Sequence, residues 1–118
     1  MKISYKKLEE ILTEVGYSNE KLDSFRKEFV DNFLAKLGSK VQTQLTPDQK
    51  QQLFNIASVA SPNIDRISAY LKTLNLESQI KQNIEVTLNE TLNYTLEQMV
   101  KNSSQKEAII INKVLSIN

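Results

Sequence analysis

Residues 87–98 read TLNE-TLNY-TLEQ, three four-residue repeats that each begin with Thr-Leu. Their leucines belong to a longer row of apolar residues spaced four apart, which comprises Ile80, Ile84, Leu88, Leu92, Leu96 and Val100. Side chains four apart lie on successive turns of one helix face and form a ridge by which helices interlock. The most regular segment of the chain therefore predicts helix packing and says nothing about chemistry.

A second row with the same spacing lies in the first half of the chain. It comprises Phe25, Phe29, Phe33, Leu37, Val41 and Leu45. Residues four apart advance about 400° around a helix, so each row slants across the helix surface, unlike the seam of a coiled coil, where spacings of three and four alternate. Two such ridges interlock at about −50°. We therefore predict two long helices that cross obliquely, with shorter helices packed around them.

Two features of these helical segments need separate predictions. Gly38 interrupts the second row, and a glycine inside a helix costs about 1 kcal/mol relative to alanine. Its position predicts a bend or a close approach by another helix, and we expect the helix to continue through it. The phenylalanines have the spacing of a helical core, and all four are predicted to be core residues: Phe25, Phe29, Phe33 and Phe54.

Start and stop signals divide the rest of the chain into shorter helices. Ser4 can cap a first helix that ends at Gly16, which suits a left-handed residue after a helix. Thr46-Pro47-Asp48-Gln49 is a capping box with Pro at the first helical position, and residues 104–107 contain a second capping box. Ser61-Pro62-Asn63 is another cap followed by Pro. These signals predict an all-α fold, a bundle of five or six helices in one domain that spans residues 1–118.

The composition removes most kinds of catalytic site. The chain has no Cys and no His, and its two glycines lie far apart, which excludes thiol chemistry, zinc sites, histidine-based catalysis and phosphate-binding glycine loops. Glu10 and Glu14 lie one turn apart, but beside Lys6 they are better interpreted as a solvated helix face than as metal ligands. We predict no catalytic, cofactor-binding or metal-binding residue and no cofactor.

The C-terminal segment, residues 105–118, allows two interpretations. Most of its circumference is apolar, which is typical of a helix that closes over the core. It can also be a docking or partner-binding helix, because an exposed patch of this kind marks an interface. The partner-binding candidates are Ile109, Ile110, Ile111, Val114 and Leu115. The three consecutive isoleucines would also suit a strand, although we predict a helix.

The order of these signals resembles that of a known family. Residues 8–12 (LEEIL) precede Gly16, residues 44–49 (QLTPDQ) end a long helix, and residues 61–63 (SPN) lead into Tyr70-Leu71 and another long helix. In this order the chain resembles an uncharacterised family of small all-helical domains from candidate-phylum bacteria with reduced genomes. The resemblance covers residues 8 to 100 and implies a helical fold. It implies no activity, because that family has none assigned, and the isoleucine-rich segment lies outside its pattern.

Charge and hydropathy limit the partners of the protein. Fifteen basic residues nearly balance 14 acidic ones, the net charge is +1, and the two signs alternate along the chain, so no nucleic-acid partner is expected. No window is apolar enough for a membrane span, and the first residues lack the apolar region of a signal peptide. We predict a cytoplasmic, non-catalytic protein that serves protein–protein interaction or structure, with a protein partner or a homo-oligomer. The alternatives are an inhibitor or immunity-type protein of a mobile element, and an enzyme that relies on carboxylates or lysines.

Overall fold

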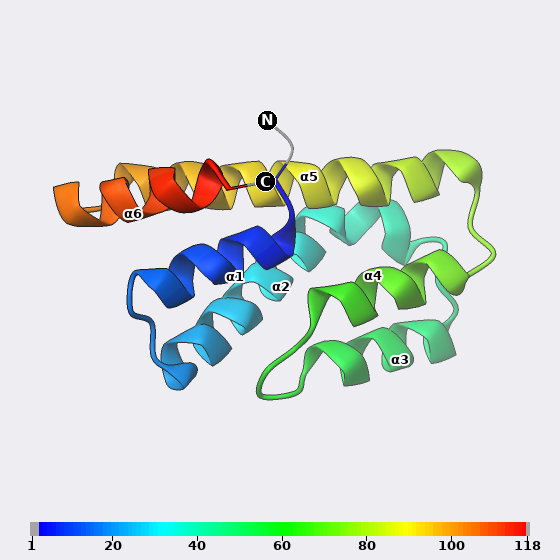
Figure 1. Cartoon of the computed structure of the whole chain (residues 1–118). Helices are drawn as coiled ribbons and strands as arrows, with labels where there is room; N and C mark the ends of the chain where they lie inside the picture. The colour runs from blue at the N-terminus through cyan, green and yellow to red at the C-terminus, as the bar shows by residue number, and fades with distance from the viewer. Residues whose placement is uncertain (1–2, 118) are drawn as a thin grey trace.

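The computed structural model describes residues 3–117, apart from the side chains at positions 39, 40 and 42, and these residues form six α-helices and no strand (Figure 1). The helices are α1 (Tyr5–Glu14), α2 (Asn19–Gln42), α3 (Pro47–Ala57), α4 (Ile64–Thr73), α5 (Ser78–Lys101) and α6 (Gln105–Leu115). The predicted all-α class is confirmed. Residues 109–111 are helical, which excludes the strand alternative for them.

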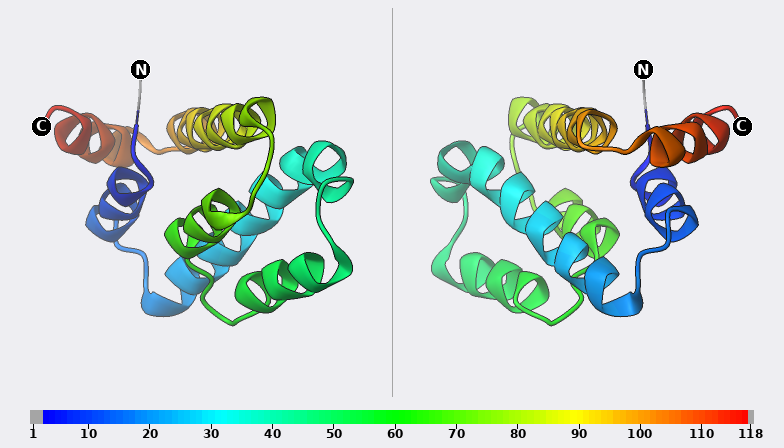
Figure 2. Two further views of the ribbon diagram at one scale, coloured as in Figure 1. Left: turned by 90° about the vertical axis from the view of Figure 1, so that its right-hand side faces the viewer. Right: turned by 90° about the vertical axis from the view of Figure 1, so that its left-hand side faces the viewer.

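The two long helices, α2 and α5, form the largest helix pair of the structure. They cross obliquely, as the slanted rows predict, and Figure 2 shows α2 running diagonally below α5. Phe29 and Phe33 of α2 and Ile84 of α5 are almost completely buried in one hydrophobic core. Thr91 of α5 is also buried, with 1% of its surface exposed. The α5 repeats thus place small threonines next to the leucine ridge.

The short helices pack in pairs around this crossing. α1 packs against α6 and also touches α5, whereas α3 packs against α4 and α2 (Figure 1). α1 contributes Leu8 and Ile11 to the core, and α4 contributes Ile67 and Leu71. α3 has no fully buried residue. The core therefore depends mainly on the other five helices, and α3 is the helix that is least covered.

Most predicted helix ends are confirmed. Ser4 caps α1, and Gly16 follows it with φ of 101°, while the N–H of Tyr17 donates to the carbonyl of Leu12. This bond and the left-handed glycine form a Schellman motif. Both predicted capping boxes, before α3 and before α6, are present. α2 is continuous through Gly38, and no described atom of another helix would lie within 4 Å of a Cβ added there, so the close approach is not found.

Three details differ from the sequence prediction. Asn63, and not Ser61, caps α4, because its side chain accepts hydrogen bonds from the N–H groups of residues 65 and 66. Phe54 is not a core residue: 64% of its surface is exposed, because Leu53 and Ile56 take the inward positions of α3 and Phe54 points sideways from them. Val100 is 47% exposed, since a row with a spacing of four rotates away from the contact over five steps.

Candidate functional site

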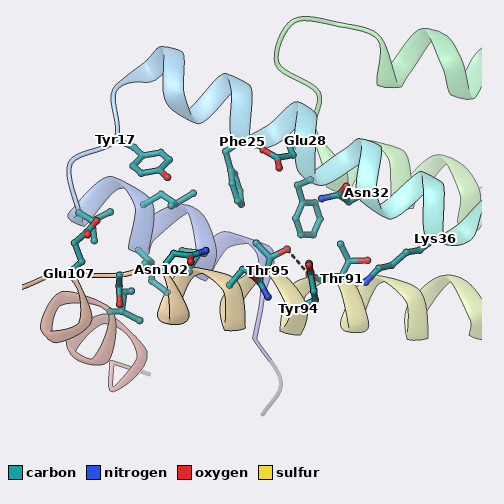
Figure 3. Close-up of a pocket in the computed structure, with 18 of the residues that line it drawn as sticks. Tyr17, Phe25, Glu28, Asn32, Lys36, Thr91, Tyr94, Thr95, Asn102 and Glu107 are labelled. Atoms are coloured by element: carbon teal, nitrogen blue, oxygen red, sulfur yellow. Dashed lines mark hydrogen bonds between the residues drawn. The ribbon is translucent and has the colours of Figure 1, made fainter. Parts of the chain in front are cut away.

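The main concave feature of the described residues is a cleft of about 780 Å³ between α2 and α5. The two helices diverge from their crossing, and α1 lies between them as a floor while α6 closes one end (Figure 3). The floor is apolar because α1 presents Ile11, Leu12 and Val15 to it, and α6 adds Ile111. Of these four only Val15 is more than 3% exposed, so the accessible apolar surface of the cleft comes from Val15 together with the half-buried Phe25 and Met99 of the walls. The crossing of two long helices therefore creates a concave surface that neither helix row predicts alone.

The α2 wall is a continuous helix face. Its lining residues are Phe25, Glu28, Phe29, Asn32, Ala35 and Lys36, with successive spacings of three, one, three, three and one. These spacings describe one face of a helix over about three turns. Phe29 is buried, with 2% of its surface exposed, and Phe25, Glu28, Asn32 and Lys36 follow one another along the wall (Figure 3).

The α5 wall is also one helix face, and all of its residues are uncharged and polar except one methionine. It comprises Thr91, Tyr94, Thr95, Gln98, Met99 and Asn102. The hydroxyl of Thr91 donates to the carbonyl of Thr87 at 2.7 Å, and that of Thr95 donates to the carbonyl of Thr91 at 2.7 Å. Because these hydroxyls are satisfied within their own helix, Thr91 can be buried without cost from an unpaired donor. Thr95 is only partly buried, so its methyl group and hydroxyl lone pairs remain to contact a ligand.

Charged groups lie at separate places along the cleft. The Lys36 ammonium lies 4.8 Å from the centre of the Tyr94 ring, a cation–π contact that links the two walls. The Glu107 carboxylate, near α6, accepts a hydrogen bond from the backbone N–H of Ser104 at 3.0 Å. Hydrogen bonds from Ser104 lower the pKa of Glu107, which is therefore ionised at neutral pH. Figure 3 shows Glu28 between them along the α2 wall.

The chemistry of the lining suits recognition. Amides, hydroxyls and aromatic rings surround an apolar floor, a combination common in binding surfaces. Within residues 3–117 no group of three or more His, Cys, Asp or Glu side chains is placed to hold a metal ion. The cleft thus offers contact area and hydrogen bonds rather than a cluster of acids and bases.

A cluster of charged residues outside the cleft ties the N-terminal half together. Arg26 of α2 donates to both carboxylate oxygens of Glu9 on α1, at 2.7 and 3.2 Å. It also donates to Asp23 at 3.1 Å and to Ser61, before α4, at 3.0 Å. These bonds join α2 to α1 and to the segment before α4, so the guanidinium acts as a structural clamp. A bidentate ion pair at Arg26 could have been predicted from the sequence. The chain has only two arginines, and arginine is the residue suited to bidentate carboxylate pairing.

The pKa values of this cluster follow from its contacts. Hydrogen bonds from Arg26 are the main cause of the lowered pKa of Glu9. Burial, followed by a hydrogen bond with Glu9, raises the pKa of the Tyr5 phenol. The cluster is therefore composed of an ionised carboxylate, a cation and a neutral phenol at neutral pH. The glutamates at 10 and 14 are not part of it, and Glu10 lies 3.7 Å from Lys7 on an exposed face.

The partner-binding candidates of the C-terminal segment have different environments. Ile111 and Val114 are buried in the core, where α6 packs against α1. Ile110 and Leu115 are half-buried against the same core, and Ile109 is 65% exposed. One face of α6 therefore closes the fold, and Ile111 also lines the cleft. The outer face of α6 presents Ile109 to the surroundings.

The cleft residues could be assigned to helices from the sequence but not to a common site. The pattern in the sequence that marks the cleft residues is a polar residue next to a core residue, such as Asn32 beside Phe33 and Thr91 beside Leu92. In the described part of the chain, no helix is both long and apolar enough to cross a membrane. Comparison with protein-family models, with curated proteins and with solved structures found no match.

Proposed function

We propose that this protein is a non-catalytic interaction module that binds an amphipathic helix of a partner protein in the cleft between α2 and α5. The observation that supports it is the form of the cleft, an apolar floor between two walls that are each a helix face. Amphipathic helices bind in such grooves through apolar residues at i, i+3, i+4 and i+7. The α2 wall, from Phe25 to Lys36, covers 11 helical steps, or about 16 Å, enough for three turns of a bound helix.

The charges of the cleft define the chemistry of the bound helix. Glu107 is acidic and lies at the α6 end, Lys36 lies toward the crossing, and Glu28 lies between them (Figure 3). A complementary helix carries a basic residue at the α6 end and an acidic residue at the Lys36 end. Tyr17 and Tyr94, which are 38% and 50% exposed, provide the aromatic contact area that concentrates binding energy in interfaces.

Ala35 offers a direct test of the site. It is an exposed alanine in the α2 wall, so Ala35→Arg places a long side chain in the cleft. The substitution should cost the helix little stability, because arginine is a good helix former. Ala69→Arg is the matched control, because Ala69 is also an exposed helical alanine but lines no cleft. A displayed library of amphipathic helical peptides provides ligands whose affinity for each variant is measured by fluorescence anisotropy.

The expected result is a set of peptides with apolar spacing of three and four that bind the wild type and Ala69→Arg equally. Ala35→Arg should bind them at least about tenfold more weakly, a change of 1.4 kcal/mol. The proposal fails if no helical pattern is enriched. It also fails if Ala35→Arg binds as tightly as the control, since the peptides would then occupy another surface.

A further inference from the structure

A second groove, of about 410 Å³, lies between α2 and α3. Its apolar lining includes Leu34, Leu37 and Val41 of α2 and Leu53 of α3. On α2 these residues are offset by about half a turn from those of the cleft, so the groove lies on the opposite face of the helix. Occupation of one concave surface therefore leaves the other accessible.

Gly38 lines this groove, and the fold of the chain does not explain why this residue is a glycine. It lies inside α2, where glycine costs about 1 kcal/mol relative to alanine. Its φ is not left-handed, and among the described side chains nothing would lie within 4 Å of an added Cβ, so neither its backbone conformation nor these neighbours require glycine. The missing side chain leaves the backbone of α2 uncovered in the groove. A ring from outside can therefore approach that backbone closely.

Phe54 projects beside the same groove. It lines the groove from α3, and 64% of its surface is exposed, far more than the other three phenylalanines of the chain. A protruding aromatic ring and an apolar hollow thus share one face of the molecule. A twofold contact pairs a face with itself, so residue i of one copy contacts residue j of the other and the reverse. A surface that carries both a protruding ring, here called the plug (Phe54), and a hollow that can receive it, here called the hole (beside Gly38), satisfies this condition.

The rim of the groove carries two basic residues and one acidic residue, and Lys27 of α2 is one of the basic ones. Asp31 lines the groove from α2, and Lys50 lines it from α3. In a twofold pairing of these two helices, Asp31 of each copy can face Lys50 of the other. Opposite charges across an interface favour that orientation and suppress others.

We propose that two copies of this chain associate through the α2–α3 groove, with the Phe54 ring of each copy inserted beside Gly38 of the other. The proposal does not depend on the function of the cleft. In such a dimer both clefts remain open, and the dimer presents two of them. The contact is confined to parts of two helices, so the association is weak and depends on concentration.

Two variants disrupt the contact in different ways. Phe54→Ala removes the plug, and Gly38→Leu fills the hole. Both variants should fold. Phe54 is mainly exposed, the space beside Gly38 is open, and leucine is a better helix former than glycine. Val86→Ala and Ala69→Leu are the matched controls, because each changes an exposed residue of α5 or α4 that lines neither concave surface.

Sedimentation equilibrium over a range of protein concentrations measures the dimer dissociation constant. The wild type and both controls should dimerise equally, and Phe54→Ala and Gly38→Leu should each weaken dimerisation at least about tenfold. A mixture of the two variants should regain association, because Phe54→Ala keeps the hole and Gly38→Leu keeps the plug, which restores one of the two contacts. A wild type that stays monomeric at all concentrations, a dimer insensitive to either variant, or a mixture with no regained association would each overturn the proposal.

Discussion

At the scale of single residues, the structure separates side chains that hold the fold from those that face outward. Arg26 belongs to the first group, since its hydrogen bonds join α2 to α1 and to the segment before α4. Phe54 belongs to the second, although its sequence spacing resembles that of the buried phenylalanines. Periodicity identifies a helix face but not the number of neighbours that cover it.

The pair between Glu9 and Arg26 gives a prediction about pH. Because Arg26 lowers the pKa of Glu9 in the folded state, the folded protein binds fewer protons than the unfolded chain between the two pKa values. The stabilisation is complete above the unfolded pKa and is lost as pH falls through the folded one. Glu9→Gln should lower the free energy of unfolding at pH 7 by about 1 kcal/mol, a value reduced for partial exposure. The difference from wild type should shrink in acid.

Urea denaturation at neutral pH and in acid measures this difference. Glu10→Gln is the control, because it removes the same charge from an exposed carboxylate that lies 3.7 Å from Lys7. Its effect should be small at both pH values. Equal effects of Glu9→Gln and Glu10→Gln at pH 7 would contradict the structural role of the clamp.

At the scale of elements, the ends of helices were the most predictable part of the structure. The capping boxes before α3 and α6 were evident from four residues each, because a capping box is a local interaction. The cap of α4 was assigned to Ser61 instead of Asn63, since both residues flank Pro62 and both are common caps. The cleft was not predictable, because it depends on how α1, α2, α5 and α6 diverge in space.

The capping box of α3 is expected to control local stability. Thr46→Ala removes the hydroxyl that accepts the N–H of Gln49, at a cost of about 1 kcal/mol. α3 has no fully buried residue to compensate, so the helix should open more often. Hydrogen exchange measured by NMR should therefore accelerate at α3 amides and stay unchanged in α5. Thr43→Ala, at an exposed threonine that makes no side-chain hydrogen bond in the described part of the chain, should leave both helices unchanged.

At the scale of the whole molecule, the crossing of α2 and α5 determines both the core and the concave surfaces. The slanted rows predicted this crossing because ridge packing depends on the spacing of side chains within each helix. Phe33 lies at the centre of the α2 row and is fully buried. The positions of the shorter helices depend on contacts between distant segments, which no local pattern encodes.

The contribution of the crossing can be measured with two phenylalanines. Phe33→Leu should lower the free energy of unfolding by about 1 to 1.5 kcal/mol, because it changes the shape of a fully packed core. Phe54→Ala removes more atoms but from an exposed ring, so its cost should stay within about 0.5 kcal/mol. Urea denaturation at a concentration that keeps each variant monomeric compares them. A larger cost for Phe54→Ala than for Phe33→Leu would contradict the assigned core.

The packing of α6 against α1 has a consequence for synthesis in the cell. The Lys7 ammonium donates to the carbonyl of Ile117 at 2.6 Å, across 110 residues of chain. α1 therefore leaves the ribosome long before α6. During that part of translation Leu8 and Ile11 lack the cover that α6 gives them in the folded protein. Until α6 emerges, the nascent α1 offers an apolar stripe to any chaperone at the ribosomal exit.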